Sequence, residues 1–223
     1  MKIGHRAAAL VATAGLAVGA IAIAPSAGAS NPTAAKAAVG TKPIAAVLTS
    51  DGNTFDTNWG DYDIVTEAAL AVLAAKPNSK VGVITKGGTA ITVFAPTDRA
   101  FQRLVTSLTG KTPKTERAAF AAVASLGIPT VEKVLLYHVI PGATITSKQA
   151  LKANGANLKT ALGSTLHVAV YAGPEISLWD KDRNARNPRV ILAKVDINKG
   201  NKQIAHGIDR VLRPVDLPPA YHG

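Results

Sequence analysis

Hydrophobic residues follow one spacing in the first half of the chain and another in the second. Residues 98–108 carry apolar side chains at i, i+3, i+4 and i+7, which is one face of an amphipathic helix. Residues 164–173 instead alternate apolar with polar or small side chains, which is the period of a strand. The pattern therefore predicts an α+β protein, with helices mainly in the first half and an antiparallel sheet in the second.

The same reasoning along the rest of the chain gives the other expected elements. Further helices are expected over 64–75, 116–126, 130–136 and 147–153, and strands over 81–85, 90–97, 175–179 and 189–197. Short polar residues stand at the expected helix starts, so we assign the N-caps to Asp63, Thr97, Thr130 and Ser147. The chain is expected to become extended at 137–142, which contains Tyr137 and His138.

The first 29 residues have the pattern of an export signal. Lys2 and Arg6 precede a run of small apolar residues, and Ala27-Gly28-Ala29 fits the cleavage pattern, so cleavage is expected after Ala29. An uncleaved anchor helix is the alternative. No later run reaches 18 uninterrupted apolar residues, so no other membrane span is expected. We therefore expect a secreted or cell-envelope protein.

Four segments of the chain are expected on this basis. A signal peptide over 1–29 is followed by a flexible spacer over 30–42, one folded domain over 43–217 and a C-terminal tail over 218–223. The 223 residues include no cysteine, so the domain is expected to depend on its core alone.

The charge of the chain favours anionic partners. Its net charge is +11, and without Lys2 and Arg6 the remaining 23 basic and 14 acidic residues leave +9. Outside a cell, such a surface attracts acidic polysaccharide, cell wall or lipid head groups. Nucleic acid is not expected as a partner, because the aromatic residues do not alternate with Lys and Arg. The sequence does not determine the oligomeric state.

A polar loop over 180–189 concentrates this charge. Its cations are Lys181, Arg183, Arg186 and Arg189. Because Arg can hold a sulfate or carboxylate through two parallel hydrogen bonds, the loop is the best candidate for binding an acidic glycan. A merely solvated loop is the alternative.

Catalytic motifs are missing from the sequence. His138, His206 and Asp98 have no serine on a Gly-x-Ser-x-Gly turn to accompany them, and there is no cysteine nucleophile. We therefore expect no enzyme activity and no cofactor.

A weak calcium pattern precedes the first long helix. Asp56, Asn58 and Glu67 occupy positions one, three and twelve of a calcium loop, but the central Gly-Asp pair is in reversed order. The helix expected from Ile64 would also occupy the second half of such a loop. Asp63 as an N-cap explains the segment more simply, so no metal site is expected.

Four segments together resemble the fasciclin (FAS1) family. They are "TVFAPTDRAFQRL", "VLLYHVIPG", "LKTALGSTLHV" and "HGIDRVLRP", in family order over residues 43–217. The chain is identified on these motifs as a single-domain member of bacterial type. One departure is "NKGNKQIAH", which is longer than the family's Asn-Gly turn and places Lys202 and Gln203 there.

The resemblance implies a fold, a function and roles for particular residues. The fold is a wedge-shaped antiparallel β-sandwich flanked by helices, and the function is adhesion or matrix contact without an established catalytic site. The structural motif residues are Thr97, Asp98, Phe101, His206 and Asp209. In the family, the pair that corresponds to Tyr137 and His138 has been proposed as an adhesion motif for receptors.

The residues themselves favour burial of the Tyr137–His138 pair. Both lie among apolar neighbours, and a buried imidazole needs hydrogen-bond partners, for which we expect Thr97 and Asp98. The leading hypothesis is a binding protein for an extracellular protein or an acidic polysaccharide. A small-ligand carrier or enzyme with a pocket near this pair, and an envelope component without a specific ligand, are the alternatives.

Overall fold

The computed structural model describes residues 39–217. The expected signal peptide, most of the expected spacer and the expected tail lie outside this range. The described helices are α1 (Ile44–Leu48), α2 (Asp63–Ala75), α3 (Asp98–Thr109), α4 (Glu116–Ala124), α5 (Ile128–Tyr137) and α6 (Ser147–Ala150), with 3₁₀ helices η1 (Lys80–Thr85) and η2 (Leu192–Lys194). The strands are β1 (Ile91–Pro96), β2 (Val139–Pro141), β3 (Asn157–Lys159), β4 (Thr165–Tyr171), β5 (Glu175–Trp179) and β6 (Gln203–Ile208).

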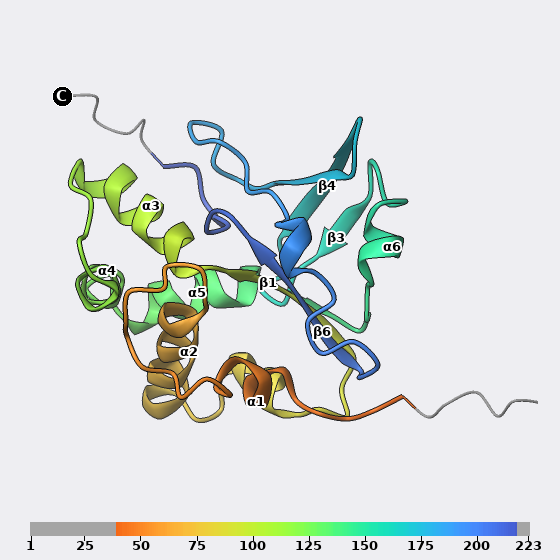
Figure 1. Ribbon diagram of the computed structural model, residues 1–223, viewed down its shortest axis with the longest axis horizontal. Helices are drawn as coiled ribbons and strands as arrows, with labels where there is room; N and C mark the ends of the chain where they lie inside the picture. The colour runs from red at the N-terminus through yellow and green to blue at the C-terminus, as the bar shows by residue number, and fades with distance from the viewer. Residues whose placement is uncertain (1–38, 218–223) are drawn as a thin grey trace, which may run out of the picture. The chain divides into compact units, whose positions relative to one another are not determined.

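A small mixed sheet of order β2-β1-β6 runs through the middle of the domain. Strand β1 pairs antiparallel with β2 and parallel with β6, with Ile91 opposite Gln203 and Pro96 opposite Ile208. All residues of β1 and β6 are buried, as expected of strands that are covered on both faces. Figure 1 shows α2 to α5 on one side of this β1–β6 pair, and β3, β4 and α6 on the other.

The second sheet has the order β3-β4-β5 and is antiparallel throughout. Its central strand follows the predicted alternation at first, since Leu166 and Val168 are buried while Thr165 is exposed. The alternation then ends, because Ala169 is buried and Val170 only half-buried. The expected α+β fold flanked by several helices is confirmed, and its strands form two small sheets, of which only the second is antiparallel throughout. The parallel pairing of β1 with β6 was not expected, because the sequence of a strand does not determine which strand it pairs with.

Apolar side chains form three buried clusters around the central sheet. One lies among α2, α3, α4 and α5, the second joins the β3-β4-β5 sheet to β1 and β6, and the third lies between α1 and the central sheet. The predicted face of α3 is confirmed for Phe101, Leu104 and Val105, which are buried, while Leu108 is exposed.

Two expected strands are absent from the described residues. Residues 80–85 form the 3₁₀ helix η1, because the Ser79 hydroxyl accepts a hydrogen bond from the Val81 N–H at 3.2 Å and starts a turn. Residues 189–197 make only isolated bridges, and η2 interrupts them. Left-handed backbone at Asp196 and Asn198 also prevents a continuous strand there.

Two expected helix caps were wrong, by three residues for α5 and by one residue for α6. Helix α5 begins at Ile128 rather than after Thr130, because Gly127 turns the chain and Pro129 fits the first turn. In α6 the cap is Thr146 rather than Ser147, and Thr146 forms a capping box with Gln149.

The last residues of the expected spacer lie against the turn before β6. The Gly40 N–H donates to the Gly200 carbonyl at 2.8 Å, and the Lys42 N–H donates to Asn201 Oδ1 at 2.9 Å.

Within residues 39–217, no single helix is long and apolar enough to cross a membrane; α4 and α5 satisfy that test only as a pair bent by 107°.

Candidate functional site

The Tyr137–His138 pair lies at the end of a helix and not in an extended segment as expected. Tyr137 is the last residue of α5, and His138 caps the helix with helical backbone angles. Both rings are buried, with exposed fractions of 0% and 2%. The burial that the apolar neighbours predicted is therefore confirmed.

The partners of His138 differ from those expected. His138 Nδ1 lies 2.7 Å from the Val134 carbonyl, and the Leu212 N–H donates to Nε2 at 2.9 Å. These contacts require the tautomer with its proton on Nδ1. Thr97 and Asp98 were wrong as partners, because they lie at the start of α3 and bond elsewhere. The imidazole ties α5 to the closing segment after β6.

Both rings of the pair are held in their neutral forms. Burial lowers the pKa of His138 to about 4, so the imidazole is uncharged at neutral pH. The Tyr137 hydroxyl donates to the Thr165 carbonyl at 3.1 Å, and burial raises its pKa to about 12. With their polar atoms engaged, the rings act as structural ties in this fold. A role of the pair in binding a receptor stays a prediction.

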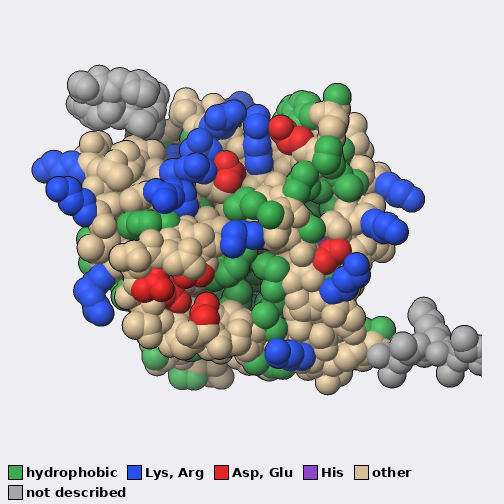
Figure 2. Space-filling view, viewed as in Figure 1, with side chains coloured by type: hydrophobic (Ala, Val, Ile, Leu, Met, Phe, Trp, Pro, Cys, Tyr) green, Lys and Arg blue, Asp and Glu red, His purple; other side chains and the backbone are tan. Residues whose placement is uncertain are grey.

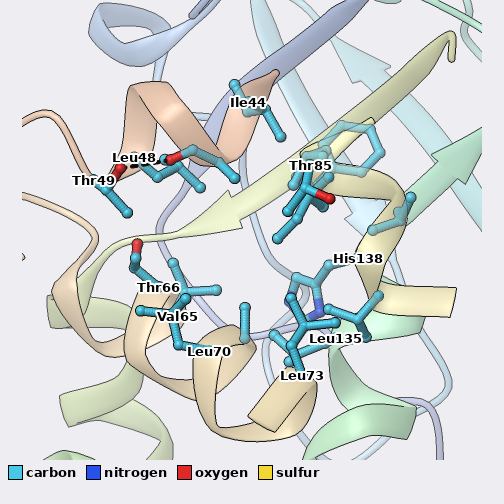
Figure 3. A pocket seen from close by; sticks show the side chains of 17 residues that line it. Ile44, Leu48, Thr49, Val65, Thr66, Leu70, Leu73, Thr85, Leu135 and His138 are labelled. Atoms are coloured by element: carbon cyan, nitrogen blue, oxygen red, sulfur yellow. Dashed lines mark hydrogen bonds between the residues drawn. The ribbon is translucent and has the colours of Figure 1, made fainter. Parts of the chain in front are cut away.

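An apolar cavity of about 60 Å³ lies beside His138. Figure 3 shows its walls, which come from α1 (Ile44, Leu48), α2 (Val65, Leu70), η1 (Thr85) and the end of α5. Sites for drug-sized ligands usually measure roughly 300–1,000 Å³. The alternative of a small-ligand carrier or enzyme pocket near this pair therefore gains no support from the cavity.

The motif residues of the closing segment also make structural contacts. His206 Nε2 lies 2.8 Å from the Ile145 carbonyl, and the Asp196 N–H donates to its Nδ1 at 3.3 Å. Asp209 Oδ1 accepts from the Arg189 N–H at 2.7 Å. These contacts fix the loop before β6 and the end of the 180–189 loop.

The four predicted cations of the 180–189 loop are not equivalent. Lys181, Arg183 and Arg186 are exposed, and no described carboxylate lies within ion-pair distance of them. Arg189 is only partly exposed, and its guanidinium lies 3.2 Å from Glu175. The loop therefore presents three cations to solvent, and Arg189 holds the loop to β5.

Further cations extend this loop surface, and the sequence analysis did not include them in the site. Arg103 of α3 and Arg210 lie 3.4 and 3.9 Å from Asp209, which they share. The charges of Arg103 and Arg186 contribute to lowering the pKa of Arg210, although burial is the main cause. Figure 2 shows Lys and Arg gathered between α3 and the loop after β5. Arg103 could have been found, because it lies on the polar side of the α3 pattern.

We call Arg103, Lys181, Arg183, Arg186 and Arg210 the basic face. Its members come from α3, the 180–189 loop and the segment after β6. Arg103, Arg186 and Arg210 lie close enough for their charges to interact, and Lys181 and Arg183 belong to the same loop as Arg186.

Three carboxylates from separate segments lie close together, Asp61 from the loop before α2, Asp98 from α3 and Glu116 from α4. One oxygen each of Asp61, Asp98 and Glu116 lies within 4.8 Å of the other two, and Asp98 and Glu116 are fully buried. Burial raises the pKa of both Asp98 and Glu116, and the neighbouring Asp61 carboxyl raises that of Asp98 further. We call this group the carboxylate triad. Sequence spacing gave no signal for it.

The triad also corrects the predicted cap of α2. Asp63 is the first residue of the helix, and the cap comes from Asp98, whose Oδ1 and Oδ2 accept from the Ile64 and Asp63 N–H groups at 2.9 and 3.2 Å. The side chain of Thr97 makes no capping bond to α3. Asp98 therefore stabilises a helix other than its own.

The calcium pattern read from the sequence does not assemble. Asp56 Oδ1 accepts from the Asn58 N–H at 2.5 Å, while Glu67 lies on α2 and accepts from Asn53. As anticipated, the helix occupies the second half of the would-be loop.

Comparison with known proteins identifies the family. The sequence profile of the Fasciclin domain matches residues 66–214, well over half of the chain. The chain belongs to the fasciclin family. Fasciclin domains are associated with adhesion and are generally non-catalytic, in line with the expectation from the sequence.

A solved fasciclin structure shows the same fold. The FAS1 domain pair of the insect cell adhesion molecule Fasciclin I is similar, with 18% identity and a TM-score of 0.52 over 78% of this chain and 52% of that chain. The present chain thus spans about half the length of that pair. No curated protein matches the chain significantly.

Proposed function

We propose that this fasciclin domain is an extracellular binding module whose basic face contacts acidic polysaccharide of a matrix or cell envelope. The observation that supports this proposal most directly is the exposure of Lys181, Arg183 and Arg186, without described acidic partners, beside Arg103 and Arg210. Arg side chains that are not already paired keep their donors for sulfate or carboxylate groups.

The backbone below the basic face is firmly anchored, which favours binding. The Arg183 N–H donates to Asp216 Oδ1 at 3.0 Å, and Arg213 Nη1 donates to Asp182 Oδ2 at 2.7 Å, where Asp182 is buried. A loop that is already ordered loses less conformational freedom when a polymer binds.

The test is a binding titration of the purified protein against heparin and hyaluronan. A triple variant, Lys181→Gln, Arg183→Gln and Arg186→Gln, should weaken binding by about tenfold at low salt, since each exposed ion pair contributes roughly 0.2–1 kcal/mol. Raising the ionic strength should weaken wild-type binding. Heparin carries sulfates and hyaluronan only carboxylates, so the pair also identifies the preferred group.

A matched control removes the same charge elsewhere. Lys86, Lys148 and Lys152 are exposed and lie outside the basic face, so replacing all three with Gln should leave affinity nearly unchanged. Equal losses of affinity in both triple variants would show that the net charge of the protein, and not the basic face, accounts for binding. Absence of binding at low salt would refute the proposal.

Export is part of the same proposal. The pattern of residues 1–29 supports a cleaved signal, and N-terminal sequencing of protein recovered from the culture medium should begin at Ser30. A mature protein that keeps Met1 would contradict it.

A further inference from the structure

We propose that the carboxylate triad of Asp61, Asp98 and Glu116 binds one divalent cation, and that this cation is Ca²⁺. One oxygen from each side chain lies within 4.8 Å of the other two. Ca²⁺ binds oxygen at about 2.3–2.6 Å, so two of its ligands are at most roughly 5 Å apart. The three oxygens therefore lie within the span of one coordination sphere.

Two oxygen atoms of the triad residues are buried without a hydrogen-bond partner among the described residues. Glu116 is fully buried, and its Oε1 has no hydrogen-bond partner within residues 39–217, while Oε2 accepts from the Asp56 N–H at 2.7 Å. Among the same residues, Asp61 Oδ1 is also buried without a partner, and the Asp61 and Asp98 carboxyl groups are close enough to share a hydrogen bond when one of them is protonated. An ionised carboxylate can only accept, and a buried acceptor without a partner costs roughly 1–3 kcal/mol or more. A cation between these oxygens would satisfy both.

No basic side chain neutralises the triad within residues 39–217. None of the ion pairs there includes Asp61, Asp98 or Glu116. The guanidinium groups that follow Asp98 and Glu116 in sequence lie over aromatic rings instead, Arg99 over Trp59 at 5.6 Å and Arg117 over Phe55 at 5.4 Å. Buried negative charges require a counter-charge, and a metal ion supplies one.

The ligand chemistry favours Ca²⁺ over other cations. All three donors are carboxylate oxygens, and the chain has no cysteine to select a softer metal. Each Asp98 oxygen accepts one backbone N–H and keeps further lone-pair capacity. Ca²⁺ accepts six to eight ligands in irregular geometry, so water can complete its shell, whereas Mg²⁺ requires a near-ideal octahedron.

Protonation is the rival way to relieve the same charge. Burial raises the pKa of Asp98 and Glu116, so a triad without metal would hold protons instead. The two explanations differ in their response to Ca²⁺, and a titration separates them.

The experiment uses the full chain, stripped with EDTA and titrated with CaCl₂ in a calorimeter and in thermal melts. At about a hundredfold excess over Kd, the melting temperature should rise by about 5–10 °C. MgCl₂ should give a smaller shift. Tb³⁺ provides a second readout, because Trp59 stands two residues before Asp61 and can sensitise its luminescence.

Conservative variants locate the site. Glu116→Gln and Asp61→Asn should each weaken Ca²⁺ binding by more than about tenfold, since even changes outside the first coordination shell cost metal sites ten- to a hundredfold. Asp51→Asn is the matched control, because Asp51 is an exposed acid of the same loop outside the triad. Glu67→Gln should also leave binding intact, because Glu67 belongs only to the unassembled loop pattern.

Each outcome supports or overturns the site. Losses in Glu116→Gln and Asp61→Asn with both controls unchanged support it, and Asp61→Asn alone decides if Glu116→Gln fails to fold. No heat and no thermal shift up to roughly 10 mM Ca²⁺, beyond the range of extracellular calcium modules, overturn it. A metal-insensitive protein that Glu116→Gln stabilises establishes the protonated triad instead. Loss in Glu67→Gln but not in Glu116→Gln moves the site to the loop.

Discussion

At the scale of single residues, His138 shows how a polar side chain becomes part of a core. Its two ring nitrogens meet one backbone donor and one backbone acceptor, from segments 74 residues apart in the case of Leu212. This arrangement works only for the neutral imidazole, because a proton on Nε2 would face the Leu212 N–H.

Stability should therefore depend on pH through His138. The unfolded imidazole takes up a proton near pH 6.5, but the folded one only near pH 4, so the unfolded state binds more protons in this window. The stability that the neutral ring contributes is complete above pH 6.5 and is lost as the pH falls. Between pH 7 and pH 5 the loss amounts to about 2 kcal/mol.

The measurement compares wild type and His138→Gln in urea at both pH values. The variant should be less stable at pH 7, and the gap should narrow by about 2 kcal/mol at pH 5, because Gln does not titrate. Tyr137→Phe serves as control, since the tyrosine pKa is about 12 and its gap should stay constant. A gap for His138→Gln that is equal at both pH values would contradict the lowered pKa, because the ring would then take up its proton equally in the folded and unfolded states.

Burial of residues was predictable from the sequence, but their partners were not. The apolar neighbours on both sides of Tyr137 and His138 predicted that the pair is buried. The contact with Leu212 depends on how the closing segment folds back, and no local spacing encodes that. The carboxylate triad was missed for the same reason, because Asp61, Asp98 and Glu116 belong to three different segments.

At the scale of elements, the strongest periodic segments were predicted well and their ends less well. Helix α3 and strand β4 follow from spacing, and β1 and β5 lie within the segments predicted as strands. Segments 80–85 and 189–197 looked like strands because they are rich in Val and Ile. Turn-forming contacts and left-handed residues prevail over that propensity.

Some segments pack so closely that only a glycine fits between them, and Gly87 is such a position. A Cβ at Gly87 would lie 1.7 Å from the Thr41 carbonyl oxygen, whereas one at Gly88 would meet nothing within 4 Å. Gly87→Ala should lower the free energy of unfolding by at least about 2 kcal/mol, because the backbone at Thr41 must move to make room for the added methyl group. Gly88→Ala should change it by no more than about 1 kcal/mol. Equal effects in chemical denaturation would show that residues 41–43 do not pack on Gly87.

At the scale of the whole molecule, the folded unit is larger than the family profile. The profile begins at residue 66, yet Ile44, Leu48 and Ile64 are buried, and Gln203 Oε1 accepts from the Ile44 N–H at 2.8 Å. These residues close the core on the side of α1. The domain therefore needs the residues before the profile.

A truncation series tests this requirement. A protein of residues 39–217 should melt cooperatively, while one of residues 66–217 should not, because it lacks α1, the loop with Asp61 and the first turn of α2. Loss of two or three fully buried aliphatic side chains alone costs several kcal/mol, at about 2–5 kcal/mol each. Circular dichroism melts decide the matter, and a cooperative transition in the shorter protein would contradict the assignment.

The parallel pairing of β1 with β6 sets the order of events when the chain is made. Strand β1 is complete at residue 96, but its neighbour β6 ends only at residue 208 of 223. Until β6 has emerged, one edge of β1 has no permanent partner, and an open edge of apolar strand invites pairing with other chains. Contacts of such long range also form slowly. A chain interrupted before residue 203 therefore keeps that edge open, so premature termination should lead to aggregation rather than to a smaller folded domain.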